Sequence, residues 1–363
     1  MHRRTFMKAA ATGAATTGLA TVLPSSAFGQ TVNEWRLLAL WPEGHPLLKY
    51  LGRFAETVRV VTQGGLRITI VPRGPVPPPK LLAAVGNGEA EMGHAVPFLW
   101  GKTIPSAAML VYFPFGLTSR EKEAWFAHGG GQDLLDRIYG EAGCKFLPLG
   151  GTGPQMGGWF KKPLGAAADL NGLRIRIGGL GAAVMAAAGA KPQNISLSGG
   201  KIQAALKADE LDAAEARTPA ADLKDGYPSQ ARVYHYPNWH EPALTFDLFI
   251  NRIKWEKLPD HMRQAVTLAA TTVDRQMLNA SVKANAKALT KMITKHGTKV
   301  TPFPQDVMES LARHANDVVP MKVAKDPLSN ELYESVMAFR RATNQWTSVT
   351  DHSFLRARDL VTL

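Results

Sequence analysis

The longest uninterrupted helical pattern in the chain runs from Pro259 to Gly297 and contains no internal proline or glycine. It begins with a proline followed by an acid and stops at a glycine, which are typical start and stop signals of a helix. At a rise of 1.5 Å per residue, such a helix extends for about 54 Å. Because this is longer than a single small domain, we expect the helix over residues 259–297 to brace two lobes or to be broken by a kink.

The chain before this helix alternates between strand-sized and helix-sized segments. Residues 36–41 predict a strand, residues 46–62 predict a helix with one apolar face, and the stretch LRITIVP predicts a second strand. The same alternation continues to about residue 240, which indicates an α/β architecture. The tail after about residue 331 predicts one more amphipathic helix, which can pack on its own chain or reach a partner chain.

The N-terminal segment has the pattern of an export signal. Arg3, Arg4 and Lys8 precede the first acid, Glu34, and a weakly apolar run follows them and ends in SSAFGQ. This run is too short for a membrane span and is typical of a cleaved signal peptide. The stretch RRTFMK has the twin-arginine pattern. We therefore expect residues 1–29 to be removed during twin-arginine export and the mature protein to be periplasmic.

Composition narrows the classes of partner. The 363 residues carry a formal net charge of +12, but the Lys and Arg residues are scattered. Scattered basic residues in an exported protein argue against a nucleic-acid partner and favour small acidic molecules. Cys144 is the single cysteine, so an intramolecular disulfide and a four-thiolate metal site are both excluded.

The stretch ADLNGLRIRIGGLG places two arginines on one side of a predicted strand. Arg174 and Arg176 alternate with apolar residues, and a glycine-rich turn follows. Such a strand is either an edge strand with a wet face or the wall of a cleft that binds an anion. A dinucleotide-binding loop has a third glycine at the position that Val184 occupies here, so the turn does not match that motif. Arg174 is expected near the lobe surface or paired with an acid such as Asp169.

Signals of catalysis are weak throughout the chain. The sequence contains no G-x-S-x-G and no H-E-x-x-H motif, and Cys144 has no activating neighbour in sequence. His235 and His240 flank the stretch YPNW, and the sequence leaves open whether they lie at the surface or in a cleft. We therefore assign no catalytic residue and predict that the protein is not an enzyme.

Three oxygen-bearing side chains follow strand-like or turn segments of the presumed second lobe: Gln155, Glu215 and Glu241. Carboxylate and amide oxygens suit a hard cation such as Ca²⁺ or Na⁺. Three residues scattered in sequence are not a motif, however, and the two glutamates can also serve as hydrogen-bond acceptors.

Six stretches occur in the order of a known family: EAEMGHA, FPFGLTSREKEAWF, GGTGPQMGGWF, LNGLRIRI, LDAAE and YPNWHEP. Together they resemble the periplasmic substrate-binding proteins of TRAP transporters, and most closely the branch that binds 2-oxo acids such as pyruvate, or lactate. The resemblance covers about residues 35–345.

The resemblance implies a bilobal α/β fold like that of periplasmic binding proteins, with two mixed-sheet lobes, a ligand cleft and a long bracing helix. Lobe I would span residues 30–152, with part of residues 243–325 returning to it, and lobe II would span residues 153–242. The extension 326–363 can mediate a homodimer.

The implied function is to bind a small 2-oxo or 2-hydroxy monocarboxylate and deliver it to the TRAP membrane subunits. An exported enzyme acting on a carboxylic acid and a ligand sensor for a membrane kinase are the alternatives.

The resemblance also implies roles for individual residues. Arg176 would clamp the ligand carboxylate, with a guanidinium fork that suits it. Gln155, Glu215 and the backbone carbonyl of Ala216 would bind a Na⁺ or Ca²⁺ ion that bridges protein and ligand. Glu241 would lie beside the ion and, with Gln155, near the substrate.

The chain departs from the branch at the proposed pocket. Ala216 stands where the branch has Trp, Pro97 and Phe98 stand where it has Ser and Tyr, and RIGG replaces RIPG. We expect these changes to make the pocket larger and more apolar, with Phe98 in its lining.

Overall fold

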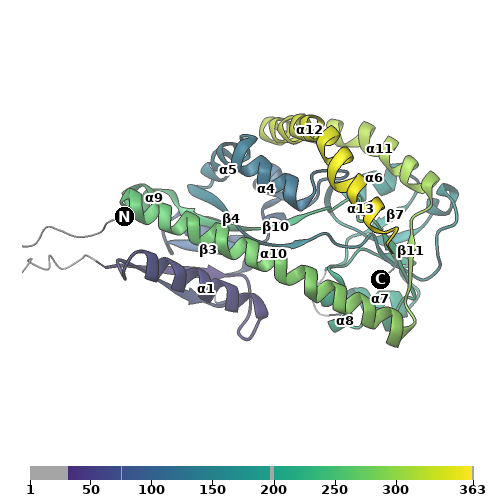
Figure 1. Cartoon of the computed structure of the whole chain (residues 1–363), viewed down its shortest axis with the longest axis horizontal. Helices are drawn as coiled ribbons and strands as arrows, with labels where there is room; N and C mark the ends of the chain where they lie inside the picture. Colours follow the sequence, from purple (N-terminus) through teal and green to yellow (C-terminus); the bar gives the residue numbers. More distant parts are fainter. Residues whose placement is uncertain (1–31, 75, 197–199, 362–363) are drawn as a thin grey trace, which may run out of the picture.

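The computed structural model describes residues 32–74, 76–196 and 200–361. The predicted signal peptide, residues 1–29, lies outside this described part. Two mixed β-sheets form the centres of two lobes, helices cover them, and one long helix extends along both (Figure 1). The expected bilobal α/β fold is thus confirmed. Below, lobe I denotes the part built on the first sheet and lobe II the part built on the second.

Five strands form the sheet of lobe I, in the order β2-β1-β3-β10-β4. Strands β1, β2 and β3 are parallel, whereas β10 is antiparallel to both of its neighbours. Apolar side chains alternate along β1, so that Trp35, Leu37 and Ala39 are buried in the core. The strands are β1 Asn33–Ala39, β2 Leu66–Val71, β3 Met92–Ala95, β4 Cys144–Gly153 and β10 Leu244–Asn251.

Six shorter strands form the sheet of lobe II, in the order β11-β9-β5-β8-β6-β7. Strand β5 is antiparallel to β8 and β9, and the remaining neighbours are parallel. The strands are β5 Gly158–Phe160, β6 Arg174–Arg176, β7 Lys191–Gln193, β8 Ala213–Ala214, β9 Val233–Tyr236 and β11 Lys299–Pro302.

Helices begin and end at the signals that the sequence provides. Pro46 begins the helix α1, the capping box of Thr118 and Glu121 begins α4, and Gly297 in the left-handed region ends α10. The helices are α1 Pro46–Val61, α2 Leu81–Gly86, α3 Pro105–Ala108, α4 Ser119–His128, α5 Gly131–Gly140, α6 Gly179–Ala187, α7 Lys201–Lys207, α8 Pro219–Lys224, α9 Arg252–Lys257, α10 Asp260–His296, α11 Gln305–Val323, α12 Pro327–Thr347 and α13 Ser353–Arg358. Short 3₁₀ turns complete the chain at η1 Pro78–Lys80, η2 Pro97–Trp100, η3 Ala167–Leu170 and η4 Tyr227–Ser229.

Helix α10 is one helix of 37 residues and spans both lobes, as Figure 1 shows. It packs on α1 and β4 in lobe I and on α8 in lobe II. Its N-terminal part is the more deeply buried, with Val266, Ala269 and Val273 in the core of lobe I. The helix therefore connects the two lobes by packing on both of them.

Within the described residues, the chain crosses between the lobes at four places. Residues 154–157 lead from β4 to β5, residues 237–243 lead from β9 to β10, α10 leads to β11, and residues 324–326 lead from α11 to α12, which packs on lobe I. Strand β11 and helix α11 therefore join lobe II, where α11 packs on α6. The first two crossings lie beside each other, because β4 and β10 are paired.

The C-terminal extension is helical from Pro327 to Arg358, in line with the expected helix, but it contains a π-helical turn that the sequence did not predict. Helix α12 ends at Thr347, a π-helical turn, η5, covers Ser348–His352, and α13 follows. The first half of α12 packs on α3, α4 and α5, with Leu332 and Val336 buried. Beyond that half, large apolar side chains are exposed, namely Trp346, Val349, Phe354, Leu355 and Leu360.

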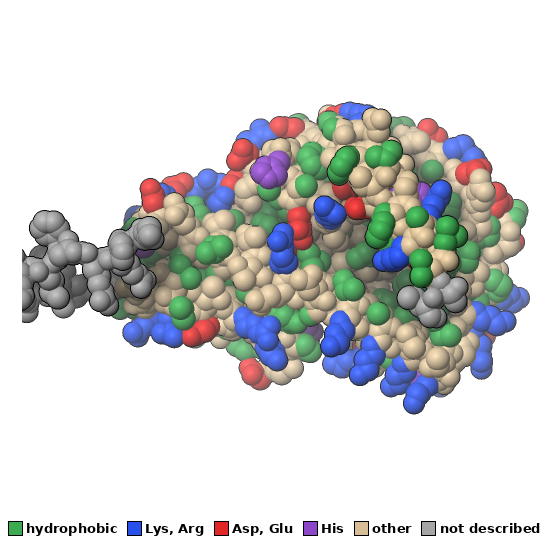
Figure 2. Space-filling view, viewed as in Figure 1, with side chains coloured by type: hydrophobic (Ala, Val, Ile, Leu, Met, Phe, Trp, Pro, Cys, Tyr) green, Lys and Arg blue, Asp and Glu red, His purple; other side chains and the backbone are tan. Residues whose placement is uncertain are grey.

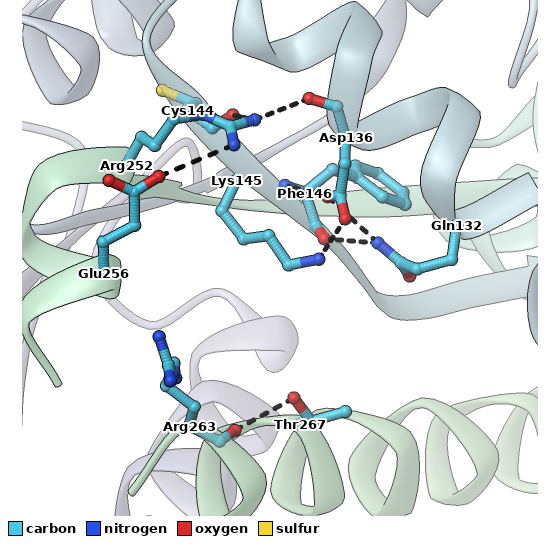
Figure 3. A network of polar contacts seen from close by, with 9 residues as sticks. All are labelled: Gln132, Asp136, Cys144, Lys145, Phe146, Arg252, Glu256, Arg263 and Thr267. Atoms are coloured by element: carbon cyan, nitrogen blue, oxygen red, sulfur yellow. Dashed lines mark hydrogen bonds and ion pairs between the residues drawn. The ribbon is translucent and has the colours of Figure 1, made fainter. Parts of the chain in front are cut away.

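A polar network ties α5 and α9 to the strand β4 (Figure 3). Asp136 of α5 pairs with Lys145 and accepts the Phe146 backbone N–H at 3.2 Å. Arg252, the first residue of α9, donates to the Asp136 backbone carbonyl at 2.7 Å. These bonds anchor the strand that carries the first crossing.

Basic side chains follow the outer face of α10 in lobe II, where Figure 2 shows blue side chains along the lower margin. Lys283, Lys287, Lys291 and Lys295 are exposed there at intervals of four residues.

Across the described residues, no helix combines the length and the apolar character that crossing a membrane requires.

Candidate functional site

Arg176 is the last residue of β6 and lies where lobe II meets lobe I. The residue is only 7% exposed, and its Nε donates to the Ile195 carbonyl at 3.1 Å. The strand pairs with β8 on one side and β7 on the other, so it is not an edge strand. The interpretation of this stretch as an edge strand with a wet face therefore fails for Arg176.

Arg174 has a different environment, although it lies on the same side of the same strand. Its side chain is 42% exposed and binds Asp212 in two-pronged fashion, with Nε and Nη2 at 3.0 and 2.7 Å from the carboxylate. Asp169, the acid that the sequence suggested, instead accepts the backbone N–H groups of Gly165 and Ala166. The surface position of Arg174 was expected, but the choice of Asp169 as its partner is corrected to Asp212.

Glu215 follows β8 and pairs directly with Arg176. The residue is 3% exposed, and its backbone N–H donates to the Arg176 carbonyl at 2.8 Å. Parallel pairing of β6 and β8 thus places this acid and this guanidinium side by side at the ends of their strands. The carboxyl ends of strands are where α/β sheets bind ligands.

Gln155 and Glu241 come from the first and the second crossing, and both are buried. The Gln155 Nε2 donates to Glu241 Oε1 at 2.5 Å, so the amide and the carboxylate join the two crossings. The Gln155 amide also lies 3.4 Å from the Thr152 hydroxyl. This arrangement leaves the Gln155 carbonyl oxygen without a hydrogen bond from any described residue.

Burial controls the protonation of the two carboxyl groups. Desolvation raises the pKa of Glu215 to about 7, opposed by Arg176 and supported by Asp222. Desolvation also raises the pKa of Glu241 well above its usual range, and the nearby Glu215 raises it further. Burial alone would lower the pKa of Arg176, but Glu215 and other neighbours hold it above its usual value. Burial thus favours the neutral form of both acids, and an additional positive charge beside them would favour the ionised form.

The loop before Glu241 is held in a fixed conformation by Asn238. Its Oδ1 accepts the backbone N–H of His240 at 3.1 Å and that of Glu241 at 2.8 Å. The Trp239 carbonyl accepts the Phe115 N–H from lobe I at 2.7 Å. His240 is fully buried, and burial together with Arg176 lowers its pKa to about 3, so its ring is neutral.

Tyr112 reaches the site from lobe I and is a residue that the sequence reasoning missed. A Cβ atom built at Gly178 would lie 2.9 Å from the Tyr112 hydroxyl oxygen, and one at Gly179 would lie 2.4 Å from its ring. The two glycines therefore let the tyrosine lie against the first turn of α6. Burial raises the pKa of Tyr112, and the carboxylates of Glu215 and Glu241 add to that rise. No motif marks this tyrosine, whereas the unusual GG after Arg176 was a visible signal.

Lys122 of α4 lies behind Glu241 and was also missed. Its Nζ donates to the Leu110 carbonyl at 2.9 Å and to the carbonyl of Ala243 in the second crossing. Burial lowers its pKa to about 8, while Glu241 and Asp274 act in the opposite direction. Lys122 thus holds the second crossing from lobe I and places a positive charge near Glu241.

The remaining predicted pocket residues lie at the margin and in the core. Phe98 is 37% exposed, and its ring centroid is 6.4 Å from that of Tyr112. Ala216 is buried in a small core of lobe II that contains Trp159 and Tyr227. Pro97 and Phe98 replace two hydroxyl-bearing residues of the branch. Tyr112 places a hydroxyl group near Phe98, so the site is less apolar than these two replacements alone would make it.

The donor set of the site is oxygen-rich but contains few acids. Among the described residues, no group of three or more His, Cys, Asp or Glu side chains is arranged to hold a metal ion. Glu215 and Glu241 supply carboxylate oxygens, and Gln155 and Ala216 can add an amide and a backbone carbonyl oxygen. Chemically, this arrangement can bind an anion at Arg176 and a hard cation beside it.

Comparison with known proteins gives a consistent result. Residues 39–326 match the family described as DctP, bacterial extracellular solute-binding protein, family 7. The chain is 36% identical over 365 residues to a monocarboxylate 2-oxoacid-binding periplasmic protein of Nostoc sp., covering 98% of each chain.

Solved structures agree with this relationship. A TRAP periplasmic solute-binding protein from Colwellia psychrerythraea, with calcium and pyruvate bound, has a TM-score of 0.80 and 29% identity, covering 90% of this chain and 99% of that one. A second such protein, from Pseudoalteromonas atlantica with sodium and pyruvate bound, has a TM-score of 0.79, 29% identity and the same coverage. A third, from Bordetella bronchiseptica, is described as a mixed-occupancy dimer with calcium and picolinate at its occupied site; its TM-score is 0.80 at 29% identity, over 91% of this chain and 98% of that chain.

Proposed function

Because the chain belongs to family 7 of the bacterial extracellular solute-binding proteins, we propose that it binds a small 2-oxo or 2-hydroxy monocarboxylate between its lobes. It is a periplasmic solute receptor of the TRAP type, a class that works with membrane subunits. The family consists of substrate-binding receptors, and we propose that this chain likewise performs no catalysis.

The observation that carries the proposal is the buried guanidinium of Arg176 at the junction of the lobes. In the described structure this group pairs with Glu215, which is buried with it. Glu215 contacts Nη1 through one carboxylate oxygen, whereas an incoming carboxylate can offer the guanidinium two oxygens in a bidentate arrangement. We propose that the ligand carboxylate takes the place of Glu215 on Arg176.

A cation fits the residues that remain. A monocarboxylate would bring a further negative charge to a site that already buries the carboxyl groups of Glu215 and Glu241 beside Arg176 and Lys122. A Na⁺ or Ca²⁺ ion offsets that charge, and the oxygens of Gln155, Glu215, Glu241 and the Ala216 carbonyl are ligands that such ions prefer. The 2-oxygen and the carboxylate of the ligand can complete its coordination. Relatives from Colwellia and Pseudoalteromonas hold calcium or sodium together with pyruvate, which supports this proposal.

We further propose that Phe98 lines the outer wall of the pocket beside Tyr112, as their ring contact suggests. The exposed apolar side chains after the middle of α12 support a homodimer contact formed by residues 326–363. The twin-arginine pattern in residues 1–29 remains a prediction of the export route.

Titration calorimetry tests the binding proposal. Wild-type protein is titrated with pyruvate, lactate and propionate, first with Ca²⁺ or Na⁺ and then after chelation in sodium-free buffer. We expect pyruvate and lactate to bind better than propionate, because propionate lacks the second oxygen for the ion. Removing the ions or introducing Glu215→Gln should weaken pyruvate binding. Equal binding of pyruvate with and without ions would contradict the bridging cation, and no binding of any acid would contradict the function.

A further inference from the structure

Three of the histidines that the structure describes are fully buried, and they differ in what their rings contact. His94 accepts from the Trp41 indole at 2.9 Å and donates to the Leu149 carbonyl at 2.8 Å. His235 contacts the Leu164 N–H through Nε2 and the Thr301 carbonyl through Nδ1. Among the described residues, neither ring nitrogen of His240 has a hydrogen-bond partner. His240 thus differs from two buried histidines in the same fold.

His240 lies within the candidate site rather than in a remote core. It directly precedes Glu241, and Asn238 fixes the backbone of both residues. A Cβ atom at Gly181, in the first turn of α6, would lie 3.0 Å from the His240 Cβ and 3.4 Å from its Cγ. The ring also lies within the electrostatic reach of the Arg176 guanidinium. The residue therefore lies in the second crossing, against the first turn of α6.

An unpartnered imidazole at this position is unfavourable by itself. A neutral imidazole has one N–H donor and one lone-pair acceptor, and burying both without partners destabilises the folded protein. Apolar residues of similar size would avoid this cost. Buried polar groups without partners are rare in folded proteins, so each one requires an explanation such as a bound ligand.

We infer that His240 contacts the bound acid, with its ring N–H donating a hydrogen bond to a ligand oxygen. The inference rests on the proposed function. In this arrangement Arg176 supplies the charge that attracts the carboxylate, and His240 supplies a directional bond without adding charge. The second ring nitrogen can accept a hydrogen bond, so the ring is able to match a 2-hydroxy group as well as a 2-oxo group.

The test separates ligand affinity from stability. His240→Leu removes both polar atoms and keeps an apolar side chain of moderate size. We expect pyruvate affinity, measured by calorimetry with Ca²⁺ present, to fall roughly 10- to 100-fold, as for a lost hydrogen bond to a charged group. The melting temperature of the ligand-free protein should stay the same or rise, because an unpartnered buried group is removed. His240→Gln retains a donor and should recover part of the affinity.

His94→Leu is the matched control, since it removes a buried histidine whose ring is fully partnered. It should lower the melting temperature and leave the pyruvate affinity of the folded protein unchanged. If His240→Leu binds pyruvate within twofold of the wild type, or behaves like His94→Leu, His240 is a structural residue and the inference is wrong. A wild-type protein that binds none of the acids would refute the proposed function, and this inference with it.

Discussion

Replacing Arg176 by alanine tests the centre of the proposed mechanism. The change removes the guanidinium that pairs with Glu215 in the described structure and that would receive the ligand carboxylate. Arg176 and Glu215 are 7% and 3% exposed, so water screens their interaction little. Truncating one partner of such a buried, hydrogen-bonded charge pair costs about 2–5 kcal/mol. We therefore expect affinity for pyruvate to fall roughly 30- to 4,000-fold.

The ligand-free variant should remain folded, because Glu215 can take up a proton. Burial already raises the pKa of this carboxyl to about 7 while Arg176 opposes the rise. Without Arg176 the pKa rises further, and the neutral acid avoids an unpaired buried charge. A folded-state pKa above the unfolded value means that the folded protein binds more protons, so stability falls as pH rises. The melting temperature of Arg176→Ala should therefore decrease from pH 5 to pH 8 more than that of the wild type.

Two further variants make the assay specific. Arg176→Lys keeps the positive charge but lacks the planar fork, so it should restore only part of the affinity. Arg174→Ala is the matched control, because Arg174 lies two residues away on the same side of the strand and pairs with Asp212 at the surface. Its affinity should stay within about twofold of the wild type, since surface ion pairs contribute little.

Calorimetry of all three variants at neutral pH decides the matter. Pyruvate binding by Arg176→Ala within threefold of the wild type would show that the carboxylate binds elsewhere. An equal loss in Arg174→Ala and Arg176→Ala would show that a general positive potential, and not the clamp, governs affinity.

Three more predictions concern closure, assembly and pH. We expect the lobes to close when pyruvate binds, because the proposed ligand lies between them and closure makes the protein more compact. Gly178→Ala would place its Cβ 2.9 Å from the hydroxyl oxygen of Tyr112 of lobe I, so small-angle scattering should record less compaction with pyruvate than in the wild type. Gly52 has open space around it, so Gly52→Ala is a neutral control. Deleting residues 348–363 removes exposed Val349, Phe354 and Leu360, and light scattering should then report a monomer; a full-length protein that is monomeric at micromolar concentration would contradict the dimer. Burial lowers the pKa of His94 from 6.5 to about 4, so the folded protein binds fewer protons than the unfolded protein between these pH values. The free energy of unfolding should therefore decrease by about 3 kcal/mol as the pH falls from 6.5 to about 4, because one pKa unit corresponds to about 1.4 kcal/mol. Denaturant unfolding of His94→Gln should lack that part of the pH dependence, and an identical slope would refute it.

The sequence predicted the parts of the fold that depend on local pattern. The absence of proline and glycine between residues 260 and 296 was sufficient for the single helix α10, and the alternation around Arg176 was sufficient for β6. The helical tail was also predicted, but its π-helical turn at Ser348–His352 was missed, because the amphipathic pattern continues through that turn. A pattern of exposed and buried faces does not reveal one extra residue in a helical turn.

Partners across the sheet were beyond the reach of sequence patterns. Arg174 was matched with the acid nearest in sequence, Asp169, but parallel pairing of β6 with β8 brings Asp212 beside it. The same pairing brings Glu215 to Arg176. Tyr112 belongs to none of the stretches that carry the resemblance, and Lys122 and His240 stand within two of them without a role that the pattern assigns. All three approach the site only through the packing of lobe I on lobe II and through the two crossings.

The pair formed by Arg176 and Glu215 connects ligand binding to ion binding. In the described structure Glu215 occupies the guanidinium, so a carboxylate ligand must displace an internal competitor before it binds. A displaced Glu215 must either stay ionised beside Glu241, which is strongly unfavourable for an unpaired buried charge, or take up a proton. A cation that accepts Glu215 as a ligand removes this cost, and the ligand in turn frees Glu215 for the cation. Each should therefore raise the affinity of the other by the same factor, as linkage requires. On this reasoning, the internal ion pair makes uptake of the acid depend on the ion.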